Sequence, residues 1–446
     1  MSGYTTVSGY TTVSGYTTVS GYTTESGRTP ADDGAGADVP SADSPAVMAA
    51  KDKAIAAIAS VDGEVQELSA RIHANPELGY EEHLASSWTA ELLARHGFSV
   101  TKPLAGLDTA FRATWSGRGP GSGTGTGTGA GPTIALLAEY DALPGISHGC
   151  GHNLIAAASV AAAIGIKNSW PDFPGTIQVY GTPAEEGGGG KIVMLDAGAF
   201  GGVDVALMFH PGVHTTVNTP SLAMASLTVE FTGVAAHAAI DPWDGINAAD
   251  AAMLFFAGVN ALRQQIRPDA RLHGVIREAG SKPNIIPARA AVDFMVRADR
   301  AEYLLPLTER VVDIARGAAL MTGAGVEIDR GKPYLDYRLS PSLGAAAEAN
   351  FATLGIATTP IAPDSPKASE DAGNISHVLP FLPISVSISQ TPIPGHSVAW
   401  RDAAISERGA DALRTAAKVL AATSIDLATD PGLLERARAE QQAAVA

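Results

Sequence analysis

The side chains best suited to chemistry in this sequence lie in four short segments. Each segment follows a run of apolar residues typical of a buried strand, and open α/β sheets place their sites at the ends of such strands. Together the segments supply a thiol, imidazoles and carboxylates. These residues are Asp141, Cys150, His152, Glu185, Glu186, His210 and His396.

This set of donors indicates a metal site. Thiolate, imidazole and carboxylate all bind Zn²⁺, and carboxylates with imidazoles also suit Mn²⁺ or Co²⁺. Cys150 and His152 are separated by a single glycine at the start of a predicted helix, so both can approach one ion. The positive end of the helix dipole would also favour the Cys150 thiolate.

The adjacent acids Glu185 and Glu186 can take different roles because neighbouring side chains point in different directions. One carboxylate can bind metal while the other remains free to move protons. Amide hydrolysis requires such a free carboxylate beside a metal-activated water, because the water must lose a proton as it attacks. Each residue alone also has a bland explanation: Cys150 could be a small buried hydrophobe, and His210 or His396 a surface residue. Only the set as a whole indicates catalysis.

The elements that must position these residues alternate between strands and helices. Amphipathic helices are predicted over 47–74 and 82–95, and they end at Pro76 and Gly97 respectively. The alternation that follows is typical of an α/β domain. The predicted strands are 109–115, 134–139, 176–181, 203–209 and 383–389, and the predicted helices among them are 154–167 and 405–421.

The pattern changes between residues 221 and 331. There the order becomes strand, helix, strand, strand, helix, strand, which is the β-α-β-β-α-β unit of a ferredoxin-like domain. We therefore predict a catalytic, metal-binding α/β domain (46–220 and 332–446) interrupted by an inserted dimerisation or lid domain (221–331). Residues 1–45, which begin with repeats of Ser-Gly-Tyr-Thr-Thr, are predicted to be a disordered tail, and the Gly-rich stretch 116–132 a loop between strands.

Composition narrows the class of protein. The chain has 446 residues, a formal net charge of −16 and 46% hydrophobic residues, as expected of a folded protein with ample core. An acidic balance without basic clusters argues against nucleic acid or anionic lipid as a partner. The single cysteine excludes an internal disulfide, no apolar run reaches the length of a membrane span, and the N-terminus has no signal-peptide pattern. The sequence therefore predicts a cytoplasmic protein with neither a membrane nor a nucleic-acid partner.

The motifs around these residues resemble those of the metallopeptidase family that includes aminoacylase, glutamate carboxypeptidase and indole-acetyl-amino-acid amidohydrolases. The likeness covers about residues 46–421 and is greatest to the subfamily with p-aminobenzoyl-glutamate hydrolase and β-alanyl-lysine dipeptidase. Where many relatives have Asp-Met-Asp, this chain has Glu139-Tyr140-Asp141, and Asn153 stands where they have a second acid; both changes fit that subfamily. The motifs that carry the resemblance are 73–78, 141–144, 150–153, 181–186, 235–238, 245–248 and 282–287.

The resemblance implies two divalent metal ions per subunit, Zn or Mn, with Co as another option. It implies that Glu185 is the general base, that Asp141 orients the ligands, and that Asn284 contacts substrate. His237, in the inserted domain, would stabilise the oxyanion in the partner subunit's site, which makes the protein a homodimer through that domain. The implied metal ligands are Cys150, His152, Glu186, His210 and His396.

The predicted activity is that of a metal-dependent amidohydrolase or dipeptidase. Its substrate would be a small N-acyl amino acid, a dipeptide or a p-aminobenzoyl-glutamate-like molecule, and Glu185 would pass the proton of the attacking water to the leaving amine. Two other hypotheses remain open. One is a cysteine hydrolase with Cys150 as nucleophile and His152 or His210 as base, and the other is a non-catalytic relative that binds a ligand. Sensitivity to a chelator separates the metal hydrolase from the cysteine hydrolase.

Overall fold

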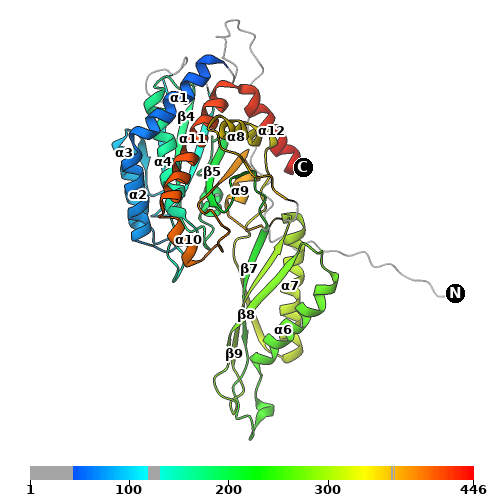
Figure 1. The fold of residues 1–446 in the computed structure, drawn as a ribbon. Coiled ribbons are helices and arrows are strands. Elements are labelled where there is room, and N and C mark those ends of the chain that lie inside the picture. Colours follow the sequence, from blue (N-terminus) through cyan, green and yellow to red (C-terminus); the bar gives the residue numbers. More distant parts are fainter. Residues whose placement is uncertain (1–43, 119–130, 363–364, 366, 446) are drawn as a thin grey trace, which may run out of the picture. The chain divides into compact units, whose positions relative to one another are not determined.

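Two β-sheets with separate hydrophobic cores make up the computed structural model (Figure 1). The predicted tail, residues 1–45, falls almost wholly outside the described residues, as does most of the predicted loop 116–132. None of the described helices is long and apolar enough to cross a membrane. The structure describes residues 44–118, 131–362, 365 and 367–445, which belong to one compact unit.

The larger sheet contains seven strands. They are β1 Ser99–Thr101, β2 Phe111–Ser116, β3 Thr133–Glu139, β4 Thr176–Thr182, β5 Val205–Gly212, β6 Thr216–Val217 and β11 Phe381–Ser387. Their order across the sheet is β1-β2-β4-β3-β5-β11-β6. The four central strands β4, β3, β5 and β11 are parallel, whereas the outer strands pair antiparallel. Nearly every residue of β3, β4 and β5 is buried, as is usual for parallel strands in an α/β domain.

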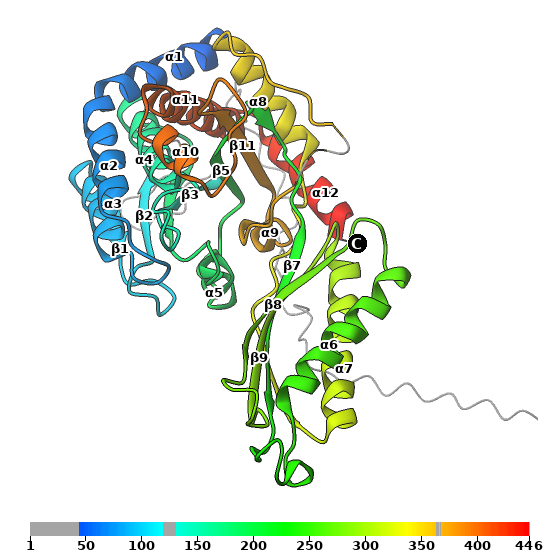
Figure 2. The same cartoon turned by 60° about the horizontal axis from the view of Figure 1, so that its bottom comes forward.

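Helices pack around this sheet (Figure 2). They are α1 Pro45–Ser60, α2 Asp62–Ala74, α3 His83–Arg95, α4 His152–Ser169, α5 Gly190–Asp196, α8 Pro341–Thr353, α9 Ala372–Ser376, α10 Val398–Ala403, α11 Glu407–Thr429 and α12 Pro431–Val445. α4 packs against β3 and β5, and α11 packs against α4, β5 and β11. Small, fully buried residues such as Ala156, Ala157 and Ala161 let α4 lie close to its neighbours. Because α4 begins at His152, this packing also positions the first residue of the helix.

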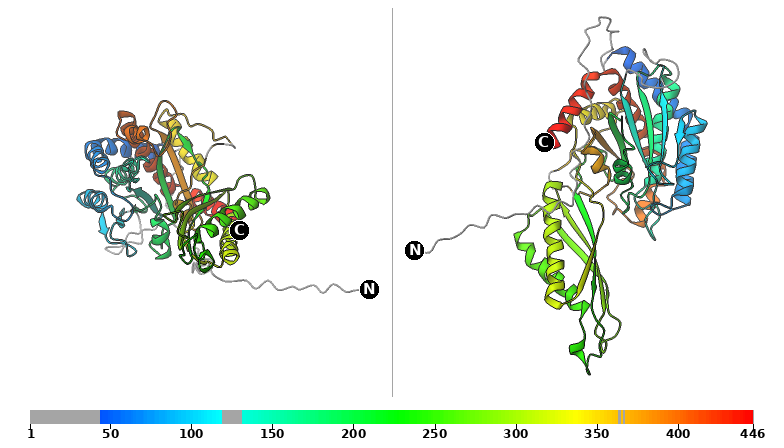
Figure 3. Two further views of the ribbon diagram at one scale, coloured as in Figure 1. Left: turned by 90° about the horizontal axis from the view of Figure 1, so that it is seen from below. Right: turned by 180° about the vertical axis from the view of Figure 1, so that it is seen from behind.

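The smaller sheet contains four strands in which every pairing is antiparallel. They are β7 Ala223–Thr232, β8 Arg271–Ala279, β9 Arg289–Ala298 and β10 Gly325–Arg330, in the order β10-β7-β9-β8. Two helices, α6 Ala248–Leu262 and α7 Ala301–Thr322, lie on the same side of this sheet (Figure 3). Short 3₁₀ turns, η1 Pro242–Asp244 and η2 Arg263–Gln265, flank α6. The chain order is therefore β-α-β-β-α-β, as the sequence pattern predicts.

Some element bounds differ from the sequence-based predictions. The predicted helix 47–74 is two helices, because Val61 leaves helical geometry at the junction, with φ −108° and ψ 5°. The predicted helix 405–421 continues to Thr429. The helices α8 and α12 were not predicted. Both are rich in alanine, which gives little contrast between a buried and an exposed face.

Candidate metal centre

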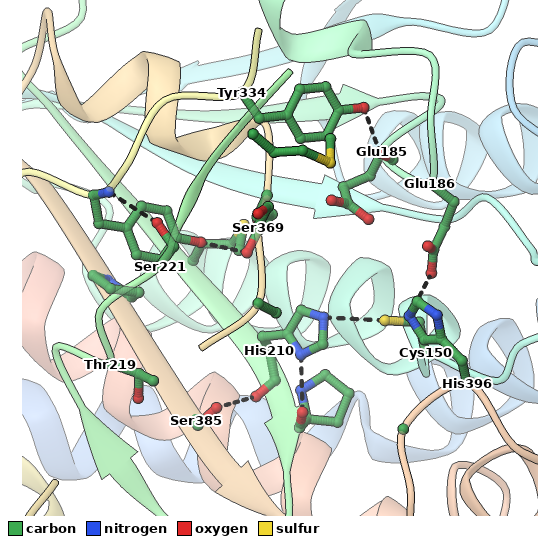
Figure 4. Close-up of a pocket in the computed structure, with 18 of the residues that line it drawn as sticks. Cys150, Glu185, Glu186, His210, Thr219, Ser221, Tyr334, Ser369, Ser385 and His396 are labelled. Carbon is green, nitrogen blue, oxygen red and sulfur yellow. Dashed lines mark hydrogen bonds and ion pairs between the residues drawn. The ribbon is translucent and has the colours of Figure 1, made fainter. Parts of the chain in front are cut away.

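Cys150 lies in the loop directly before α4. Gly151 follows it with φ 85°, and a Cβ at this glycine would lie 2.8 Å from Pro211 Cγ, so only glycine allows this close approach. The indole Nε1 of Trp400 donates to the Cys150 carbonyl at 3.0 Å. The loop thus holds the Cys150 Sγ 3.4 Å from His210 Nε2 on β5, as Figure 4 shows.

Asp141, in the loop after β3, joins two of the predicted ligands. Its Oδ1 lies 2.9 Å from His152 Nδ1, and its Oδ2 accepts a hydrogen bond from the Glu186 backbone N–H at 2.9 Å. The contact at Nδ1 leaves His152 Nε2 facing the other acids. That nitrogen lies 3.8 Å from Glu185 Oε2 and 3.9 Å from Glu186 Oε1. Asp141 therefore contacts both the His152 ring and the Glu186 backbone.

Two groups that contain only predicted ligands share Cys150, and a third joins His152 and Glu186 to Glu185. In each group the possible ligand atoms lie within 4.8 Å of one another. The first group contains His152 and His210, and the second contains Glu186 and His396, whose Nε2 lies 3.6 Å from Glu186 Oε1 (Figure 4). Residues from a loop, a helix, a strand and a C-terminal turn thus converge on one place.

The hydrogen bonding of these residues is incomplete in a way that fits a bound cation. His152 Nε2 and Glu186 Oε1 are buried and have no hydrogen-bond partner in the part of the chain that the structure describes. Buried polar atoms are nearly always paired, because an unpaired one loses its interaction with water without compensation. Both atoms belong to residue types that bind Zn²⁺ or Mn²⁺. The residues present therefore fit a metal centre.

The ionisation of the cluster also depends on what it binds. Burial raises the pKa of the Cys150 thiol well above its usual range. Burial, with the charges of Glu139 and Glu186, raises the pKa of Glu185 in the same way, and burial lowers the pKa of His210 to about 4. Alone, these groups would therefore be neutral. A divalent cation among them would favour the thiolate and the carboxylates.

A buried charge cluster that the sequence analysis did not predict lies beside the site. The Lys191 ammonium is fully buried and forms ion pairs with Glu139 and with Asp371, the latter at 2.6 Å. Although burial opposes ionisation, the charges of Lys191 and His152 lower the pKa of Glu139 to about 2. Glu139 Oε2 lies 3.5 Å from His152 Nε2, so this cluster contacts the candidate ligands. The signal in the sequence was a lysine directly after a glycine run, which by itself indicates nothing so specific.

A cavity of about 600 Å³ adjoins the candidate metal ligands. Cys150, Glu185, Glu186, His210 and His396 line it. Its other walls include Arg297 on β9, Ser369, and the apolar side chains of Met208, Met224 and Trp400. The Arg297 guanidinium donates to Ser369 Oγ at 2.8 Å and contacts Met295 Sδ at 3.8 Å, and no ion pair joins it to an acid among the described residues. An uncompensated cation therefore lies in the cavity wall.

Two predicted site residues do not lie at this cavity. His237 and Asn284 are in neighbouring loops of the smaller sheet, where the Ala238 N–H donates to the Asn284 carbonyl at 3.1 Å. The His237 side chain is exposed, and Asp241 Oδ1 accepts its backbone N–H at 3.0 Å. Neither residue lines the cavity of its own chain.

Comparison with known proteins identifies a family and several relatives of this chain. Residues 135–425 match the model of peptidase family M20/M25/M40. Mouse (Mus musculus) Xaa-Arg dipeptidase is 38% identical over 387 residues, which is 84% of this chain and 88% of the relative. A p-aminobenzoyl-glutamate hydrolase chain of Escherichia coli strain K12 is 38% identical over 282 residues, 58% of this chain and 56% of the relative.

Solved structures agree on the fold. The crystal structure of a Bacillus subtilis protein, described as a dinuclear metal-binding peptidase from the M20 family, matches with a TM-score of 0.60. It is 21% identical and covers 82% of this chain and 98% of its own. The predicted family, α/β fold class and amide hydrolase activity are confirmed by these matches. The chain belongs to peptidase family M20/M25/M40.

Proposed function

We propose that this chain is an amide hydrolase with two divalent metal ions per subunit, Zn or Mn, acting on a small dipeptide or N-acyl amino acid. The observation that carries the proposal is that two buried atoms without a hydrogen-bond partner among the described residues, His152 Nε2 and Glu186 Oε1, lie at the same place as Cys150, His210 and His396. Two groups of donors that share one thiol provide for two neighbouring cations. The dinuclear metal named for the Bacillus subtilis structure supports this number.

Glu185 is the proposed general base. Divalent cations held by these residues would act as Lewis acids and make a nearby water more acidic. Glu185 lines the cavity, its Oε2 lies 3.8 Å from His152 Nε2, and its carboxylate makes no hydrogen bond that would commit it elsewhere among the described residues. It can therefore accept the proton of the attacking water and deliver it to the leaving amine. Asp141 keeps both His152 and Glu186 oriented during this transfer.

Arg297 is the proposed anchor for a carboxylate of the substrate. A guanidinium whose partners are a hydroxyl and a thioether sulfur, and which lies in a cavity wall, can bind a carboxylate with two parallel hydrogen bonds. A dipeptide and p-aminobenzoyl-glutamate both carry such a carboxylate beyond the amide bond. The names of the two relatives, each 38% identical, support substrates of this class.

The smaller sheet is the proposed dimer interface. β8 is an edge strand, and of its residues only Leu272 is buried, while Val275 and Ile276 are 62% and 42% exposed. An exposed edge strand with apolar side chains offers a site for pairing with a second copy. His237 and Asn284 would then reach the partner's cavity, where His237 would stabilise the oxyanion. The single unpaired cysteine supports the cytoplasmic location that the sequence predicts.

Metal removal tests the proposed function. Exhaustive chelation should abolish hydrolysis of dipeptides and p-aminobenzoyl-glutamate, and adding Zn²⁺ or Mn²⁺ should restore it, as measured by release of the free amino acid. A competing cysteine hydrolase is suggested by the 3.4 Å distance between Cys150 Sγ and His210 Nε2. That alternative predicts activity that survives chelation and is lost on thiol alkylation, an outcome that would contradict the metal proposal.

A further inference from the structure

The segment 77–82, between α2 and α3, connects the loop of Asp141 with the loop of Glu185. The Glu77 carbonyl accepts a hydrogen bond from the Ala142 N–H at 2.8 Å, next to Asp141. Glu82 Oε1 accepts one from the Ala184 N–H at 2.7 Å, next to Glu185. Part of this segment belongs to the motif 73–78, to which the proposed function assigns no role.

The segment is itself anchored to a helix. The carboxylate of Glu77 accepts hydrogen bonds from the backbone N–H groups of Leu84 and Ala85 at the start of α3, each at about 2.9 Å. These donors have no partner within a helix, so a carboxylate at this place stabilises the helix end. The segment 77–82 therefore has a fixed position relative to the packed core, and what it touches is held in turn.

The backbone that Glu82 holds is an unusual one. Ala184 adopts φ 56°, a left-handed conformation that an alanine rarely takes without support from its surroundings. A Cβ at Gly79 would lie 3.0 Å from Ala184 Cβ, so the segment packs directly on this turn. Glu82 is fully buried, and its Oε1 is the acceptor for the Ala184 N–H.

We propose that Glu82 is a positioning residue, which sets the direction of the Glu185 carboxylate through its hydrogen bond to Ala184. The inference rests on the proposed function, in which Glu185 is the base. Glu186, the next residue, is held separately by Asp141 through its own N–H. Loss of Glu82 should therefore disturb the base more than the metal ligand.

Two substitutions test this in the metal-loaded enzyme. Glu82→Ala removes the acceptor, so kcat should fall roughly 10- to 100-fold, the scale expected for a small misplacement of a catalytic group, while KM stays within about twofold. Glu82→Gln keeps an oxygen acceptor for the Ala184 N–H and should retain most of kcat. Burial and the charge of Asp141 raise the pKa of Glu82 to about 7, so an uncharged amide suits this position. If Glu82→Ala does not fold, Glu82→Met, which fills the space without an acceptor, replaces it.

Tyr80→Phe is the matched control. The Tyr80 hydroxyl donates to the Gly188 carbonyl at 2.6 Å, on the same turn but beyond Glu186. Its loss should change kcat far less than Glu82→Ala does. Equal losses in both variants would show that general support of the turn is at stake, and would overturn a specific role for Glu82.

Two further measurements separate this inference from the proposed function. The affinity for Zn²⁺, measured by competition with a chromophoric chelator, should be the same in Glu82→Ala as in the wild type, and a marked loss would overturn the inference. In a Glu185→Gln background, Glu82→Ala should cause no additional loss of kcat; an additive loss would mean that it acts elsewhere. If the wild type lacks chelator-sensitive activity, the proposed function fails. A crystal structure of Glu82→Ala would then still decide whether Ala184 leaves its left-handed conformation, as the inference requires.

Discussion

The two sheets of this protein differ in how deeply their strands are buried. In the larger sheet, every residue of β3 from Ile134 to Glu139 is buried, and its parallel neighbours β4 and β5 are almost as deeply buried. In the smaller sheet, β7 alternates between buried and half-buried residues, and β8 is exposed along nearly all its length. The central strands of the first sheet are buried within one chain, whereas the second sheet ends in the exposed edge strand β8.

This difference explains where the chemistry lies. Parallel strands end on the same side of their sheet, so the residues that follow them meet there. Asp141 follows β3, Glu185 follows β4, and His210 lies near the end of β5. The antiparallel sheet has no such common end, and its residues in the cavity wall are Met224, Met295 and Arg297. Catalysis and substrate recognition are thus expected to depend on different sheets.

The largest effect should come from the larger sheet. Glu185→Gln removes the proposed base while preserving the shape of the side chain, so kcat should fall between about 10²- and 10⁴-fold. Metal content, measured by elemental analysis, and the thermal unfolding temperature should not change, because the proposed ligands are untouched. Near-wild-type turnover in this variant would remove Glu185 from its role.

An effect of intermediate size is expected from the open edge of the smaller sheet. The double substitution of Val275 and Ile276 by lysine places charges along β8, so a dimer formed through this edge should dissociate. Loss of the partner's His237 should lower kcat by about 10²-fold, the scale for one oxyanion donor. Sedimentation velocity measures the first effect and steady-state kinetics the second.

The matched control for that experiment is Leu320→Lys. Leu320 lies on α7, a helix that packs on the smaller sheet, and is 85% exposed but not on β8. It should leave both the mass in solution and kcat unchanged. A chain that is monomeric before any substitution, yet fully active, would contradict the proposed interface.

The smallest effect concerns substrate binding by the wall of the cavity. Arg297→Met should raise KM roughly 10- to 100-fold, as expected for the loss of a charge-assisted hydrogen bond, with a smaller change in kcat. Arg289→Met is the control, because Arg289 lies on the same strand but is exposed and pairs with Glu230. If both variants raise KM equally, the charge of the sheet matters rather than the position of Arg297.

The sequence was informative about the fold wherever local patterns were strong. Continuous apolar runs predicted the buried strands β3, β4 and β5, and the change of pattern after residue 221 predicted the order of elements in the smaller sheet. Prediction failed where the pattern was weak. α8 and α12 have too little contrast between their faces, and the break at Val61 interrupts a run whose buried residues keep one helical spacing.

The candidate site was predicted in the same uneven way. The residues that the structure brings together, such as Cys150, His152 and Glu186, stood in motifs that could be read directly. The contribution of Glu139 and Lys191 could not be predicted, because it depends on the ion pair between them. Glu139 lies on β3 and Lys191 on α5, which are far apart in the sequence. The same holds for Glu82, which is distant in sequence from the Ala184 that it holds.

By itself, the sequence determined the family, the class of reaction and the types of side chain available for it, because these follow from residue chemistry and short spacings. Only the tertiary structure decided that Arg297 rather than Arg289 lies in the cavity wall without an acidic partner, and that Glu82 accepts a hydrogen bond from the turn before Glu185. Such properties arise from burial and from contacts between distant segments. No local pattern encodes them, since the free energy of a charge depends on what surrounds it.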